Sequence, residues 1–133
     1  MAFTCDNEIE IDGGDAAERR AAANLVLASE SVDEDSARRV ESGGSLILRA
    51  TSVDGLPEEE LASLAIQFPG LSLTLVYFSK DGEFYGYAKA GPEESAAESD
   101  DFDEDTLDLV GRRHDGDGIA FARSRYSLGR ASG

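Results

Sequence analysis

The amino-acid sequence predicts an α+β fold in which two helices pack on one face of a mixed sheet of four or five strands. Apolar and polar residues alternate over residues 3–11, 46–51 and 71–78, which is the period of a half-buried strand. Apolar residues recur at helical spacing over residues 16–29 and 57–68. Because a right-handed connection places each crossover helix on the same side of the sheet, we expect both helices to cover one face.

The first strand and the first helix are predicted from residues 3–29. One side of the strand carries Phe3, Cys5, Asn7, Ile9 and Ile11. Asp12-Gly13-Gly14 ends the strand, and Asp15 is a suitable N-cap for the alanine-rich helix that follows. The small side chains on the inward stripe of this helix would let it lie close to the sheet: Ala17, Ala21, Leu25 and Ala28.

Weaker signals cover residues 30–44. Residues 31–36 are typical of a loop, and residues 36–41 indicate a short helical turn before Gly43-Gly44. The second strand is predicted at 46–51, with Leu46, Leu48 and Ala50 on one side.

The clearest pattern in the chain begins at Pro57, which suits the first turn of a helix. The apolar stripe of this helix consists of Leu61, Leu64, Ala65 and Phe68. Pro69-Gly70 ends the helix, and a strand follows over residues 71–78. Lys80-Asp81-Gly82 then predicts a turn into an antiparallel partner strand at 84–90.

With both helices on one face, the opposite face of the sheet would carry Ile47, Val76, Phe78, Tyr85 and Tyr87. This set is too apolar to remain bare in water. We therefore expect either the C-terminal segment or another subunit to cover it.

The composition changes after residue 90. Residues 91–110 contain nine acidic residues and no basic one, which predicts a solvated, mobile loop at 91–102 and a short helix at 103–110. Residues 119–126 alternate enough to form a last strand. Because residues 111–133 carry five arginines against two aspartates, we expect this tail to lie near the acidic segment.

The charge balance and the length of the chain limit the classes of protein to which it can belong. The 133 residues suit one domain, and 28 acidic residues against 12 basic ones give a formal net charge of −16. Such a charge repels phosphate, so direct nucleic-acid binding is not expected. It indicates solubility, adaptation to a salty cytoplasm, or an acidic surface for a basic partner. A single cysteine, no secretory signal and no long apolar run predict a cytoplasmic protein without a membrane segment.

The stretch from Leu61 to Gly91 resembles the C-terminal signature of the YubB-type ferredoxin-like domain, found in plasmid- and phage-associated proteins of unknown activity. The matching residues are Leu61, Leu64, Phe68, Pro69, Gly70, Leu71, Tyr77, Gly82, Phe84, Gly86 and Gly91. The resemblance implies a ferredoxin-like plait over residues 1–90. Within the same domain, the acidic segment 91–110 and a C-terminal strand and tail, 111–133, would follow. No catalytic residue is carried over.

No catalytic or metal site is predicted, and no cofactor. Cys5 is the single cysteine and His114 the single histidine, and one of each cannot complete a structural zinc site. A nucleophile–base pair would require the nucleophile to contact His114, and no sequence motif indicates such a contact. Residues 101–105 begin like a calcium loop, but Thr106 and Arg112 replace the required glycine and glutamate. Loose divalent-cation binding and a carboxylate-dependent enzyme are the weaker alternatives.

The sequence thus favours a small non-enzymatic protein-interaction module that uses an open sheet face and an acidic surface. The interaction residues would be Ile47, Val76, Phe78, Tyr85, Tyr87, Asp100, Asp101, Asp103 and Asp105. A protein partner or a second copy would cover the sheet face. The aromatic residues also suit stacking of single-stranded RNA, but the charge opposes a polyanion. The alternative function is mimicry of nucleic acid by the acids of residues 93–108, which would engage a basic DNA- or RNA-binding protein.

Overall fold

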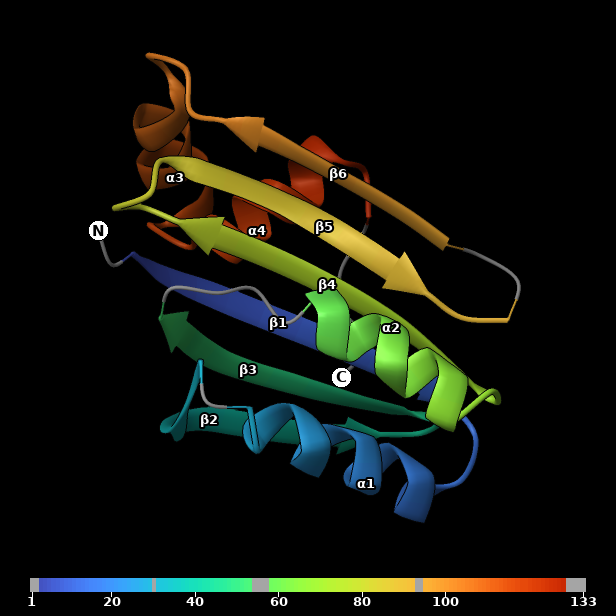
Figure 1. Ribbon diagram of the computed structural model, residues 1–133. Coiled ribbons are helices and arrows are strands. Elements are labelled where there is room, and N and C mark those ends of the chain that lie inside the picture. The colour runs from blue at the N-terminus through green and yellow to red at the C-terminus, as the bar shows by residue number, and fades with distance from the viewer. Residues whose placement is uncertain (1–2, 30, 54–57, 93–94, 129–133) are drawn as a thin grey trace.

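The computed structural model describes residues 3–29, 31–53, 58–92 and 95–128. Over these ranges, six strands form one antiparallel sheet, and a pair of helices lies on each of its faces (Figure 1). The strands are β1 (Thr4–Gly13), β2 (Val32–Ser42), β3 (Ser45–Val53), β4 (Leu71–Ser79), β5 (Phe84–Ala90) and β6 (Ser95–Asp101). The helices are α1 (Ala16–Leu27), α2 (Glu58–Gln67), α3 (Thr106–His114) and α4 (Gly118–Arg125). The strand order β2-β3-β1-β4-β5-β6 makes β2 and β6 the two edges.

The first face of the sheet is covered by α1 and α2, which lie in front of it in Figure 1. The Asp15 carboxylate accepts a hydrogen bond from the Glu18 backbone N–H (2.8 Å), and the Glu18 side chain accepts one from the Asp15 N–H (3.3 Å). This capping box confirms the prediction that Asp15 is the N-cap of the first helix. Pro57, predicted to open the second helix, lies outside the described residues.

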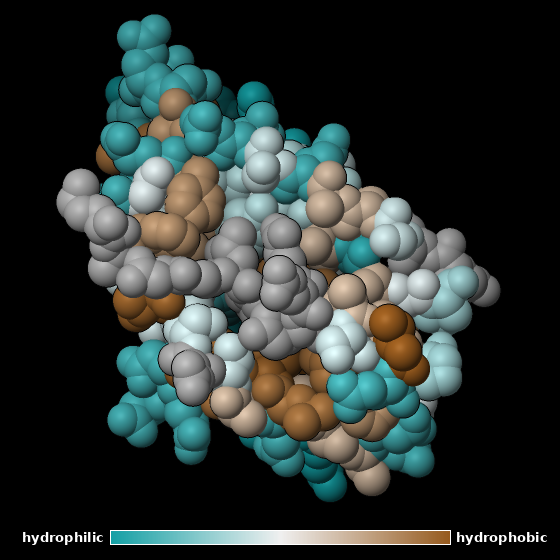
Figure 2. Space-filling model, in the orientation of Figure 1, coloured by the Kyte–Doolittle hydropathy of each residue, from teal (hydrophilic) through white to brown (hydrophobic). Residues whose placement is uncertain are grey.

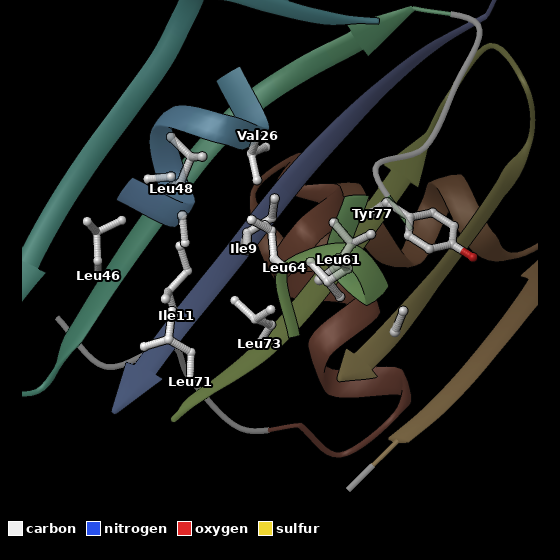
Figure 3. Close-up of a cluster of buried hydrophobic side chains, with 14 residues drawn as sticks. Ile9, Ile11, Val26, Leu46, Leu48, Leu61, Leu64, Leu71, Leu73 and Tyr77 are labelled. Atoms are coloured by element: carbon white, nitrogen blue, oxygen red, sulfur yellow. The ribbon is translucent and has the colours of Figure 1, made fainter. Parts of the chain in front are cut away.

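The first core lies between these two helices and the sheet (Figure 3). Its buried side chains are Ile9, Ile11, Ala22, Ala23, Val26, Leu46, Leu48, Leu61, Leu64, Leu71, Leu73, Leu75, Tyr77 and Ala88. Alternate residues of β1, β3 and β4 point into it, as the period of two in the sequence predicted.

The inward stripe of α1 differs from the predicted one. Its buried residues are Arg19, Ala22, Ala23 and Val26. Leu25, which was expected to face inward, is 44% exposed. A guanidinium nitrogen of Arg19 donates to the carbonyl oxygens of Gly13 (2.8 Å) and Gly14 (3.1 Å). These bonds hold the Arg19 side of the helix against the end of β1.

The second face is covered by α3 and α4, which lie behind the sheet in Figure 1. The second core consists of Val76, Phe78, Tyr85, Val110, Ile119, Phe121 and Ala122. The Phe78 ring lies 5.1 Å from the Phe102 ring and 6.3 Å from the Phe121 ring, measured between centroids. The C-terminal part of this chain therefore closes the apolar face, one of the two outcomes that the sequence left open.

The predicted ferredoxin-like plait, with a mixed sheet of four or five strands and two main helices on one face, is wrong. The sheet has six strands over the described ranges, and every neighbouring pair is antiparallel. Two further helices pack on the second face. Part of the error lies after residue 90, where the predicted loop and the predicted last strand are in fact β6 and α4, and part lies in residues 32–42, which form β2.

The two edge strands were not predicted because their polar sequences carry little apolar periodicity. Residues 32–42 form β2 rather than a loop and a helical turn, with a bulge between Asp33 and Arg38. Residues 95–101 form β6, although residues 91–102 were predicted as a mobile loop. Residues 93–94 of that predicted loop lie outside the described ranges. In both cases backbone pairing with the neighbouring strand supplies the order.

The segment predicted as the last strand is helix α4. The Asp117 carboxylate accepts a hydrogen bond from the Ala120 backbone N–H (3.1 Å), which caps the helix. Ile119, Ala122 and Arg123 are buried on one side of it, at spacings i, i+3 and i+4. The short helix predicted at 103–110 is confirmed as α3, although it begins at Thr106. None of the described helices has the length and apolar composition needed to cross a bilayer.

Candidate functional site

An acidic edge runs along β6 and through the loop before α3. We define the acidic edge as Glu98, Asp100, Asp101, Asp103, Glu104 and Asp105, all of them exposed. Figure 2 shows a hydrophilic surface at the top of the molecule, where β6 ends and α3 lies in Figure 1. The structure thus places the four predicted aspartates along one edge of the sheet and in the loop that follows it.

Hydrogen bonds hold two of these carboxylates in place. The Tyr126 hydroxyl donates to Asp100 Oδ2 (2.6 Å). Asp103 Oδ1 accepts hydrogen bonds from the Asp105 backbone N–H (2.9 Å) and the Thr106 hydroxyl (3.0 Å). These bonds lower the pKa of Asp103, because they stabilise its charged form.

The predicted sheet-face residues lie in a different environment from the acidic edge. Val76, Phe78 and Tyr85 are 0%, 4% and 3% exposed because α3 and α4 cover them. Ile47 and Tyr87 are half-buried, and the Tyr87 ring packs 4.9 Å from the Tyr126 ring. The prediction that an open sheet face presents the first three to a partner is therefore wrong for this fold.

A buried ion cluster joins α4 to the sheet. Glu8 is 3% exposed, and its two carboxylate oxygens each accept a hydrogen bond of 2.6 Å, one from Arg49 Nε and one from Arg123 Nε. Arg49 faces Glu8 across the β1–β3 pair, whereas Arg123 reaches it from α4. Arg123 Nη2 also lies 3.9 Å from Glu10 Oε2. The buried carboxylate is thus balanced by two guanidinium groups.

A charged pocket of about 280 Å³ lies beside this cluster, on the face covered by α3 and α4. Its lining includes Asp6, Ser36, Arg49, Thr51, Asp117 and Gly118. Arg49 Nη1 lies 3.6 Å from Asp117 Oδ2, so the Arg49 guanidinium contacts two carboxylates at once. A second cavity of about 410 Å³ shares Asp6 and is bounded by Thr4, Lys80 and Asp81.

The two aspartates of the charged pocket differ in their surroundings. Burial raises the pKa of Asp6, the charge of Asp117 raises it further, and Arg49 opposes both effects. Asp117 is held by the Ala120 N–H and lies near Arg49. The Asp6 carboxylate, by contrast, accepts no hydrogen bond from any side chain in the described ranges, so its charge is the less compensated of the two.

The residues considered for metal binding or nucleophilic chemistry are kept apart by the sheet. Cys5 is fully buried on the α1–α2 face, and burial raises the pKa of its thiol to about 11. His114 ends α3 on the opposite face, with its ring 6.0 Å from that of Phe121. Among the described residues, no group of three or more His, Cys, Asp or Glu side chains is placed to hold a metal ion.

The residues of the ion cluster and the charged pocket were not predicted from the sequence. Glu8 alternates with apolar residues along the first strand, so the sequence placed it on the side opposite Ile9 and Ile11. Its pairing with Arg49 depends on the register of the β1–β3 pair. One local signal was present: Asp117 precedes Ile119, Ala122, Arg123 and Tyr126, a helical spacing after an N-cap.

No protein-family model, no curated protein and no solved structure matches this chain.

Proposed function

We propose that the protein is a non-enzymatic interaction module that binds a basic, extended segment of a partner protein along the acidic edge. The observation that carries this proposal is that β6 is an edge strand of the described sheet. It pairs with β5 on one side, and no described strand pairs with its other side. An edge strand offers backbone N–H and C=O groups to an added strand, an established mode of peptide recognition.

The charges of the edge select the kind of segment. Glu98 and Asp100 project to the side of α3 and α4, and Asp101 projects to the other side, since successive strand residues alternate. Lysine or arginine side chains on either side of an added strand would therefore meet a carboxylate. Acids on an edge also discourage pairing between two copies, because like charges would oppose one another.

A binding assay with two peptides separates strand pairing from simple charge attraction. The first peptide is short and alternates Arg or Lys with Val or Thr; the second has the same charges with a central proline, which removes a backbone donor. We expect the first peptide to bind more tightly in fluorescence anisotropy. Its affinity should fall between about 50 mM and about 300 mM salt, because screening shortens the range of the attraction.

A pair of double variants locates the site. E98Q/D101N removes two charges from β6, and E34Q/D35N removes two from β2, the other edge. We expect the β6 variant alone to weaken binding, by roughly threefold to tenfold for two exposed charge contacts. Equal binding of the two peptides, or equal loss in the two variants, would refute strand addition at the acidic edge.

A further inference from the structure

The charged pocket presents both signs of charge within a few ångströms. Asp6, Arg49 and Thr51 project from β1 and β3 toward the start of α4, where Asp117 and Gly118 complete the wall. With Ser36 of β2, the pocket is therefore built by four segments of the chain, and it exists only when α4 is docked on the sheet.

The Arg49 guanidinium lines the pocket between two carboxylates, those of Glu8 and Asp117. Its Nε is committed to the buried Glu8 carboxylate at 2.6 Å, which fixes the plane of the group. The side chain is nevertheless 48% exposed and lines the pocket, so its terminal nitrogens lie within reach of a bound molecule. A guanidinium oriented in this way is suited to a carboxylate, which accepts two parallel hydrogen bonds from it.

The two aspartates are placed to bind a cation. Asp117 Oδ1 is occupied by the Ala120 N–H, while Oδ2 faces Arg49. Asp6 accepts no side-chain hydrogen bond within the part of the chain that is described, and Asp117 and Arg49 are among the charges that act on it. An ammonium group brings three N–H donors and a positive charge, and it would relieve the repulsion between the two carboxylates.

We propose that this pocket binds a free α-amino acid, with the ligand carboxylate on Arg49 and the ligand ammonium on Asp6 and Asp117. Arg49 Nη1 and Asp117 Oδ2 are only 3.6 Å apart, so a ligand must carry its positive and its negative group close together. An α-amino acid carries both groups on one carbon atom, whereas an ω-amino acid separates them and a diamine has no negative group. A volume of about 280 Å³ is near the lower end for ligand pockets, which favours a small side chain.

The test is a titration of the full chain followed by amide NMR signals, with L-alanine and L-serine as probes. We expect saturable shifts at the amides of Thr51, Gly116 and Gly118, which line the pocket. N-acetylalanine lacks the ammonium and alanine methyl ester lacks the carboxylate. Each should bind roughly tenfold or more weakly, the usual loss for one charge-assisted hydrogen bond. Putrescine and β-alanine should bind more weakly than either probe.

Three variants assign the contacts. D6N should weaken L-alanine binding by roughly tenfold, whereas the control E41Q, in the exposed Arg20–Glu41 pair outside the pocket, should leave it unchanged. R49K should weaken binding of L-alanine but not of its methyl ester, because the ester has no carboxylate for the guanidinium. The proposal is overturned if neither probe gives a saturable shift, if putrescine binds as tightly as L-alanine, or if D6N and E41Q behave alike.

Discussion

Replacing Glu8 by glutamine should strongly destabilise the protein, because it leaves the Arg123 guanidinium buried without a full counter-charge. Arg123 is 9% exposed as a side chain and Arg49 is 48% exposed, so Arg49 can recover water while Arg123 cannot. Glutamine can accept one of the two 2.6 Å hydrogen bonds, but its amide donors then face the second guanidinium. Breaking a buried pair in this way costs about 3–5 kcal/mol.

The matched control is E41Q, which makes the same chemical change in the exposed Arg20–Glu41 pair. That pair is 59% and 40% exposed, so its loss should cost less than about 1 kcal/mol. Urea unfolding followed by circular dichroism measures both. With a slope of about 2 kcal/mol per molar urea, E8Q should lower the midpoint by about 2 M, and E41Q by less than about 0.5 M.

A second variant keeps the test informative if E8Q fails to fold. E8M/R123M removes both buried charges and replaces them with apolar side chains of similar length. We expect it to be more stable than E8Q, because both members of the most buried ion pair are removed together and Glu10 loses only a contact of 3.9 Å. Equal midpoints for E8Q and E41Q, or a double variant less stable than E8Q, would show that the ion cluster does not anchor α4 as argued.

Two further predictions concern the junction of α4 with the sheet and the pH dependence of stability. A Cβ on Gly118 would overlap the Phe78 ring, so G118A should lower the free energy of unfolding by about 1–3 kcal/mol. This loss should be smaller in an F78L background, and an equal loss in both backgrounds would contradict the contact. Burial and Asp117 raise the pKa of Asp6, so the native protein binds a proton there that the unfolded chain has already lost. The stability contributed by this group falls as the pH rises from the pKa of an unfolded aspartate, about 3.9, through the raised pKa of Asp6, so the stability of D6N relative to wild type should rise over that range. The pKa of Asp81 is lowered by the Thr4 backbone N–H, so its contribution is present at neutral pH and is lost in acid. The stability of D81N relative to wild type should accordingly fall as the pH rises toward about 3.9, and unfolding curves that move the two variants in the same direction would refute the assignment.

The elements that could be predicted are those with a regular apolar period. Residues 46–51, 71–78 and 84–90 have the composition and period of strands, and they coincide with β3, β4 and β5. The N-cap at Asp15 was equally visible, since a capping box is a local arrangement of a few neighbouring residues. The acidic aspartates were also found from composition alone, because exposed charge needs no tertiary partner.

The elements that could not be predicted depend on a neighbour for their order. β2 and β6 are polar and mostly exposed, so their own sequences do not distinguish a strand from a loop. Glu8 looked like a solvent-facing residue of a half-buried strand, whereas it is the buried centre of an ion cluster. Its burial requires Arg49 from β3 and Arg123 from α4, which approach it only through the sheet register and the docking of α4.

The sequence by itself determined which segments bury an apolar face, how the first helix begins, and that the surface is strongly acidic. These properties follow from local spacing and from residue chemistry, which do not depend on what lies opposite in space. The tertiary structure alone decided that α3 and α4 close the second face and that Asp6, Arg49 and Asp117 meet in one pocket. Such contacts join residues far apart in the chain, and a change of one residue in strand register would separate them.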